Sequence, residues 1–182
     1  MPAKKAENKA TSNPSKPLVH PANEFRRAYE YLGRIEILEG ALAGSPFVDV
    51  TALANLAQQQ LGAGFPRNAA HLLRSAEHLC FAALAPVHVT DSLVNRELKQ
   101  AITMEFETMM RRAEEQWQDE EHANRHAIED LFTRALDHGR RAFTQGAFRP
   151  ALEFARAAEA LSCVGEGLPA TLPDRVTGRL AS

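Results

Sequence analysis

Two arginines and two histidines alternate along one segment of the chain at the spacing of a helical face. In chain order they are Arg67, His71, Arg74 and His78. Separations of four, three and four residues place them in one narrow stripe of a helix. Four donor-rich side chains in a line can hold a carboxylate, a phosphate or an acidic peptide, so the spacing predicts a site that binds an anion or a partner. The competing interpretation is a solvated polar face, or one that pairs with the acidic residues between 105 and 130.

A second candidate for chemistry is a pair of histidines in the segment DEEHANRHAIED. His122 and His126 are one helical turn apart, and Glu129 and Asp130 follow one turn later. Two imidazoles at this spacing can chelate a transition metal, with a carboxylate as third ligand. The segment lacks the HExxH pattern, and no second segment supplies a matching Glu-x-x-His. We therefore expect a charged surface here, with no metal and no cofactor.

Other residues that commonly carry chemistry lack the necessary context. No serine lies in a nucleophile-elbow pattern, and no glycine-rich loop could cradle a phosphate. Cys80 and Cys163 lie within helical patterns, without the spacing of a metal site, and are predicted to be free thiols. The expectation is a protein that is not an enzyme.

The segment that carries the Arg/His stripe occurs twice. Residues 64–80 read GFPRNAAHLLRSAEHLC, and residues 146–162 read GAFRPALEFARAAEALS. Aligned without a gap, they agree at more positions than the roughly two expected by chance. The matches are Gly64/Gly146, Arg67/Arg149, Ala69/Ala151, Arg74/Arg156, Ala76/Ala158, Glu77/Glu159 and Leu79/Leu161. The chain is therefore predicted to contain repeated helical hairpins.

The stripe itself is not a property of the repeat. At the equivalent positions the second copy carries Arg149, Glu153, Arg156 and Ala160. Both histidines have been replaced there, whereas both arginines remain. The functional interpretation is that the first copy has been specialised for an anion.

Hydrophobic spacing in the rest of the chain is that of helices, and the first half contains no segment that alternates with period two. Capping residues, glycines and prolines set the boundaries. We expect helices from Asn23 to Gly40, from Asp49 or Thr51 to Gly62 or Gly64, from Pro66 to Leu84 and from Arg149 to Val164. The fold class is therefore all-α, with five or six helices in antiparallel hairpins.

Residues 91–145 admit two arrangements, because neither Gly nor Pro occurs between Val87 and His138. An apolar stripe keeps one angular phase throughout, which favours a single helix of about 50 residues. The usual length of helices favours two, with a break between Gln118 and Arg125. The stripe comprises Ile102, Phe106, Met110, Ala113, Trp117, Ile128, Leu131, Ala135 and Ala142. Near Trp117 it is either core or, with Met104, Met109 and Met110, a docking surface for a partner helix.

Composition limits the class of partner. The chain has 182 residues, 45% of them hydrophobic, and a formal net charge of -2. This balance offers no general attraction to nucleic acid, and no apolar run is long enough to span a membrane. We expect a cytoplasmic protein with one all-α domain over 22–165, between a flexible lysine-containing tail at 1–21 and a second tail at 166–182.

The second copy with its preceding helix, ALDHGRRAFTQGAFRPALEFARAAEAL, resembles a tetratricopeptide repeat. The small and aromatic positions of that motif are occupied by Gly139, Gly146, Phe148, Ala151 and Ala158. The first copy keeps Gly64, Ala69 and Ala76 but has Pro66 at the aromatic position. The resemblance covers two hairpins, about 49–84 and 126–164, and implies a non-enzymatic interaction or adaptor module that binds a peptide or a partner domain.

Two copies are fewer than the roughly three that a solenoid needs to be stable alone. The N-terminal helix and the segment 91–145 must complete the core, or a second chain must. The sequence therefore leaves open whether the protein forms a homo-oligomer. The alternative function is a helical-bundle enzyme, either of the HEPN type or metal-dependent, that uses the Arg/His stripe or His122 and His126. The ribonuclease signature of HEPN proteins, an Arg followed by His after four to six residues, is absent.

Overall fold

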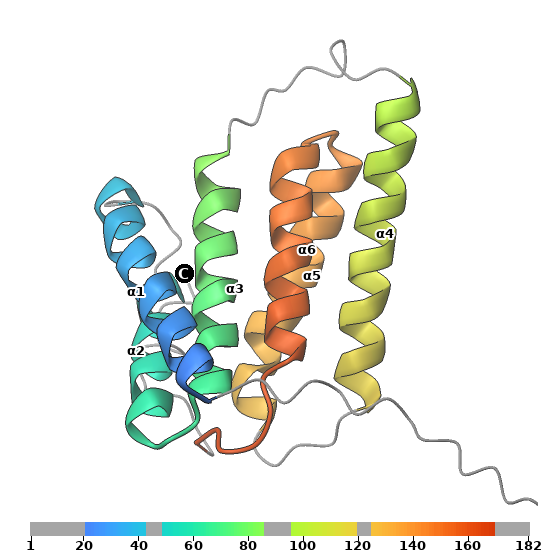
Figure 1. The fold of residues 1–182 in the computed structure, drawn as a ribbon. Coiled ribbons are helices and arrows are strands. Elements are labelled where there is room, and N and C mark those ends of the chain that lie inside the picture. Colours follow the sequence, from blue (N-terminus) through green and yellow to red (C-terminus); the bar gives the residue numbers. More distant parts are fainter. Residues whose placement is uncertain (1–20, 43–48, 86–95, 120–124, 170–182) are drawn as a thin grey trace, which may run out of the picture.

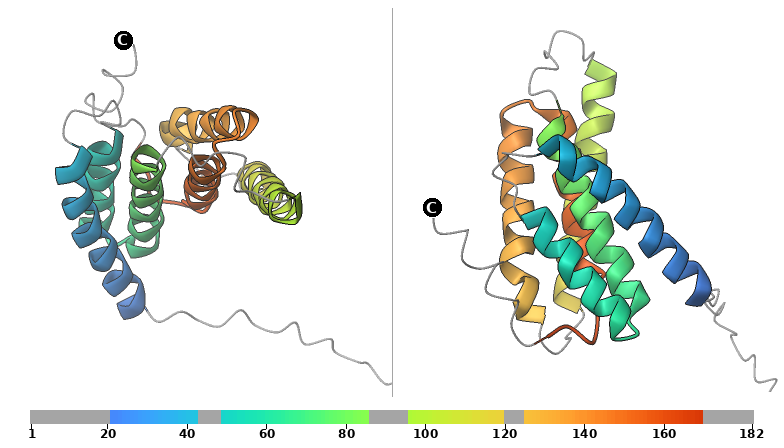
Figure 2. Two further views of the ribbon diagram at one scale, coloured as in Figure 1. Left: turned by 90° about the horizontal axis from the view of Figure 1, so that it is seen from above. Right: turned by 90° about the vertical axis from the view of Figure 1, so that its left-hand side faces the viewer.

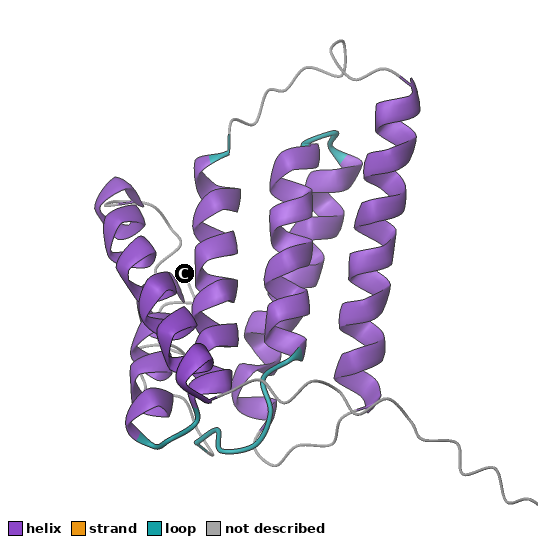
Figure 3. Ribbon diagram, in the orientation of Figure 1, coloured by secondary structure: helices purple, strands orange, loops and turns teal. Residues whose placement is uncertain are grey.

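The described part of the chain consists of helices joined by short loops. A computed structural model describes residues 21–42, 49–85, 96–119 and 125–169. These residues contain no strand, so the predicted all-α fold is confirmed (Figure 3). The elements are α1 (Pro21–Leu42), α2 (Asp49–Gly62), α3 (Pro66–Leu84), α4 (Arg96–Asp119), the 3-10 turn η2 (Arg125–Ile128), α5 (Glu129–Thr144) and α6 (Phe148–Ser162).

One helix start differs from the sequence expectation, and one helix end decides between the two arrangements expected for residues 91–145. Helix α1 begins at Pro21 and not at the predicted cap Asn23, because proline is well suited to the first turn of a helix. In the segment 91–145, α4 ends at Asp119 and α5 runs back in the opposite direction, so the two-helix alternative holds (Figure 1).

The helices form two units of three. In each unit a hairpin, α2–α3 or α5–α6, packs against one further helix that runs parallel to its second member, α1 on α3 and α4 on α6 (Figures 1 and 2). The units meet where α3 and α6 lie side by side and antiparallel. Equivalent helices of the two units are therefore related by an approximate two-fold axis. The sequence repeat is the trace of this symmetry in the amino-acid sequence.

The hairpin turns of the two units make the same hydrogen bonds. Gly64 and Gly146 both have positive φ, 85° and 75°, which only glycine adopts without strain. Each glycine N–H donates to the carbonyl three residues earlier, and the following N–H donates to the carbonyl five residues earlier. The equivalence of the two copies thus extends to the backbone.

The core is continuous through both units. Leu72 and Leu73 of α3, and Ala158 and Leu161 of α6, are fully buried, as is Ala76. The apolar stripe of α4 also faces inward, with Phe106 stacked on Phe143 and Trp117 stacked on Phe132. Most of the apolar stripe between Ile102 and Ala142 is therefore core, which confirms the first of the two interpretations given for it.

The C-terminal boundary of the domain lies later than predicted. Residue 166 was expected to begin a tail, yet Leu168 is buried in the core. The side chain of Asn68, at the start of α3, donates to the Glu166 carbonyl and accepts from the Gly165 N–H at 3.0 Å. Residues 1–20 and 170–182, which the sequence predicted to lie in tails, are outside the described residues.

Candidate functional site

Helix α6 has a single stripe that is not buried. It contacts α3, α4 and α5, so only one face is left for solvent. Within Phe148–Ser162 every residue is buried except Arg149, Leu152, Arg156 and Glu159, and Cys163 continues the same line. These residues recur every three or four positions, so they form one open stripe, the floor stripe, along α6.

The middle of the floor stripe lines a cavity of about 440 Å³ between α3, α4 and α6. Helix α3 contributes Arg74, which the sequence stripe predicted, and α6 contributes two residues of its floor stripe. The far wall comes from one side of α4. The lining residues are Arg74, Met104, Glu105, Thr108, Met109, Arg112, Arg156 and Glu159. We call this feature the α6 groove.

Three arginines from three helices converge on the α6 groove. Arg156 is neutralised, since it donates to Glu153 and to Glu105, both at 3.0 Å. Arg74 and Arg112 have no ion-pair partner among the described residues. Arg74 and Arg156 occupy equivalent positions of the two copies, which explains why two like charges meet near the approximate axis.

A buried carboxylate ties α3 to α6 beside the groove. Glu153, only 2% exposed, has its Oε2 2.8 Å from His78 Nδ1 and accepts a hydrogen bond from Arg156 at Oε1. Arg149 completes the cluster at 3.4 Å. Burial raises the pKa of Glu153, but the His78 hydrogen bond and the charges of His78, Arg156 and Arg149 outweigh it and lower that pKa below 4.5. His78 is therefore held inside the fold by α6 and not by the acidic residues of α4.

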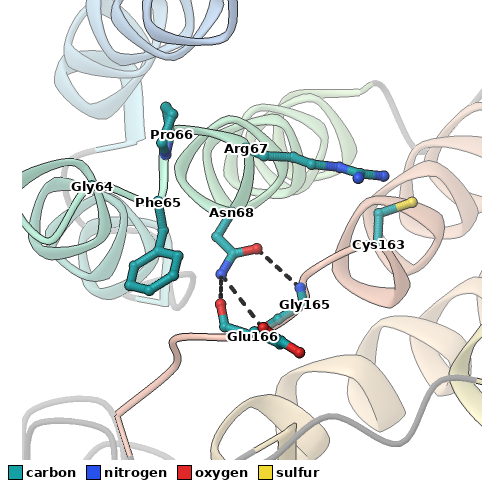
Figure 4. Close-up of a pocket in the computed structure, with 8 residues that line it drawn as sticks. All are labelled: Gly64, Phe65, Pro66, Arg67, Asn68, Cys163, Gly165 and Glu166. Atoms are coloured by element: carbon teal, nitrogen blue, oxygen red, sulfur yellow. Dashed lines mark hydrogen bonds between the residues drawn. The ribbon is translucent and has the colours of Figure 1, made fainter. Parts of the chain in front are cut away.

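Arg67 lies at the other end of the Arg/His stripe, beside a second cavity of about 390 Å³ (Figure 4). This cavity lies between the start of α3 and the loop after α6, and the Arg67 side chain extends toward Cys163. Burial, reinforced by the charge of Glu159, raises the pKa of Cys163 despite its hydrogen bond to Gln116. The free thiol predicted here stays protonated and weakly nucleophilic.

The four predicted site residues therefore do not share one surface environment. Arg74 lines the α6 groove, Arg67 lines the second cavity, and His78 is committed to Glu153. His71, which lies between Arg67 and Arg74 in the stripe, is half-buried and also makes an interaction. Of the four, Arg67 and Arg74 are the two that line these cavities.

Sequence reasoning missed Arg112 of α4 as a site residue. It lies 38 positions after Arg74, and no local pattern connects the two. Met104 of the same wall was considered as a docking residue, and it is 62% exposed. Helical spacing of Met104, Thr108 and Arg112 was the one available signal, because these residues share a face.

The second candidate from the sequence is only partly described. His122 lies outside the described residues, and His126 is exposed in η2. Among the residues that the structure describes, no group of three or more His, Cys, Asp or Glu side chains could hold a metal ion.

Comparison of the chain with protein-family models, with curated proteins and with solved structures finds no match. None of the helices in the described ranges has the length and apolar character needed to cross a membrane. The interpretation of the α6 groove therefore depends on its own geometry.

Proposed function

We propose that this protein is a non-enzymatic interaction module that binds an acidic segment of a protein partner in the α6 groove. The observation that carries the proposal is the convergence of Arg74 and Arg112 on one cavity without an ion-pair partner among the described residues. Guanidinium groups bind carboxylates through paired hydrogen bonds, which are stronger than neutral ones. An acidic side chain placed between the two arginines would satisfy both.

The remaining lining residues favour a peptide over a nucleic acid. Met104 and Met109 supply flexible apolar contacts of the kind found at peptide-binding surfaces. Glu159 lines the same cavity and would repel the regularly spaced phosphates of a nucleic acid strand, whereas a peptide can place its acidic residues away from it. The resemblance of the hairpins to tetratricopeptide repeats supports the same class of function.

The proposal is tested by selecting binders from a phage-displayed library of random linear peptides. Selection on the wild-type protein, with depletion on the Arg74→Glu/Arg112→Glu variant, is expected to enrich Asp and Glu. Binding of the enriched peptides, measured by fluorescence anisotropy, should weaken about tenfold or more in each single charge reversal, since each removes a charge-assisted hydrogen bond.

Arg141→Glu is the matched control. Arg141 is an exposed arginine of α5 that lines neither cavity, so its reversal changes the net charge equally without touching the groove. Enriched peptides without an excess of acidic residues, or equal losses in Arg141→Glu and Arg74→Glu, would refute the proposed function.

A further inference from the structure

We infer that the acidic segment binds as an amphipathic α-helix that lies along α6, between α3 and α4. This inference rests on the proposed function and specifies the conformation and side-chain pattern of the partner. It follows from the walls of the α6 groove, the length of the floor stripe, the order of residues along α4 and the charges that line the groove.

The walls of the groove are all helices. Its lining residues come from α3, α4 and α6, whose backbone N–H and C=O groups are bonded within each helix. An extended peptide needs a sheet edge or other free backbone groups to pair with, and the described walls offer no strand. A helical partner satisfies its own backbone and presents only side chains, as these walls require.

The floor stripe of α6, which includes the floor of the groove, is long enough for several helical turns. The open stripe of α6 runs from Arg149 to Cys163, about 21 Å at the rise of an α-helix. On one side α4 runs parallel to α6, and on the other α3 runs antiparallel to it (Figures 1 and 2). A helix of roughly four turns matches this length.

The wall formed by α4 sets the order of side chains on the partner. Met104, Thr108 and Arg112 follow one another at successive turns, so an exposed apolar side chain and an unpaired arginine lie about 12 Å apart. On a helical partner this distance corresponds to seven or eight residues. We expect an apolar residue over Met104 and a Glu or Asp, two turns away on the same face, between Arg74 and Arg112.

Charge selects the occupant. The unpaired charges of the groove are Arg74 and Arg112 against Glu159, since Glu105 is paired with Arg156. The unpaired charge of the groove is therefore positive in sum, and a partner helix with acidic residues complements it. A second copy of this chain and a nucleic acid strand are the competing occupants, and the experiment below separates them.

The test uses synthetic, fluorescein-labelled peptides with the sequences enriched in the library selection. We expect acidic and apolar residues to recur with the period of a helix, and circular dichroism to show that helicity rises on mixing with the full chain. A central proline substitution at a non-contact position should weaken binding about a hundredfold, because proline disfavours a helix interior by about 3 kcal/mol. Met104→Glu should weaken binding of the same peptides, while Arg141→Glu should not.

The outcomes distinguish the two proposals. Acidic peptides that bind through Arg74 and Arg112 but tolerate the central proline would overturn the helical inference and leave the proposed function standing. Loss of self-association, measured by sedimentation velocity, in Arg74→Glu/Arg112→Glu would identify a second copy as the occupant and overturn the inference. Competition by oligodeoxythymidylate at the groove would overturn both.

Discussion

At the scale of single residues, the structure explains why one position of the stripe changed between the copies. Glu153 stands where the first copy has His71, and it lies within hydrogen-bond distance of His78 of the other copy. A histidine at both positions would leave His78 and the neighbouring arginines without a counter-charge in the buried interface. The loss of the stripe in the second copy is therefore part of what joins α3 to α6.

Glu153 gives the first stability prediction. Its pKa in the folded protein lies below the ordinary 4.5, so the folded state gains stability from its ionised form above that pH and loses this contribution as pH falls further. Glu153→Gln should unfold about 1–3 kcal/mol more easily at neutral pH. Its stability should also fall less steeply than that of the wild type as the pH is lowered below about 4.5.

Urea denaturation at a series of pH values measures both effects. Glu115→Gln is the control, because Glu115 is exposed and its pair with Arg111 on the same helix contributes little. Parallel pH profiles for the wild type and Glu153→Gln would show that Glu153 is not coupled to folding.

At the scale of elements, α6 depends on small residues because it packs against three other helices. Its alanines at 151, 155, 157, 158 and 160 are all buried. On α5, which packs against it, Gly139 lies close to α6, since an added Cβ would be in van der Waals contact with Phe154 Cβ at 3.4 Å. Larger side chains would force the axes apart on one side or another.

Overpacking of this contact is the next prediction. Ala158→Leu should destabilise the protein by about 1–3 kcal/mol, because Ala158 is fully buried and the added atoms have no space. Thermal unfolding followed by circular dichroism would measure the change. Ala101→Leu, at an exposed position of α4, should leave the midpoint nearly unchanged, and an unaltered midpoint in Ala158→Leu would contradict the hairpin contact.

At the scale of the whole molecule, two three-helix units share one core. The cluster of buried apolar residues runs without interruption from Ala28 of α1 to Leu168 after α6. Neither unit can expose its face of the α3–α6 contact without exposing apolar surface to water. The units are therefore expected to unfold together.

Coincident unfolding transitions are the corresponding prediction. Trp117 is the single tryptophan and reports on the second unit, whereas far-ultraviolet circular dichroism reports on all helices. A Tyr31→Trp/Trp117→Phe variant moves the probe to α1. All three urea transitions should coincide as for a two-state protein. A separate, earlier transition of either probe would show that the units are independent.

The sequence by itself determined the local part of this structure. Helical periodicity predicted the all-α fold and the exact span of α3, and glycines at 64 and 146 marked the hairpin turns. These features depend on residues within a few positions of each other, where spacing and backbone preference act directly. The repeat added the equivalence of α3 and α6, but not their antiparallel contact.

Only the tertiary structure decided which residues the Arg/His stripe contacts. The stripe of α3 is one line in sequence, yet its neighbours come from α6 and α4, so His78 meets Glu153 while Arg74 shares a cavity with Arg112. The sequence left the break after Asp119 open, because the apolar phase continues through it while the usual length of helices favours two helices. Contacts between residues far apart in the chain depend on how whole helices pack, and periodicity states which face is buried but not what covers it.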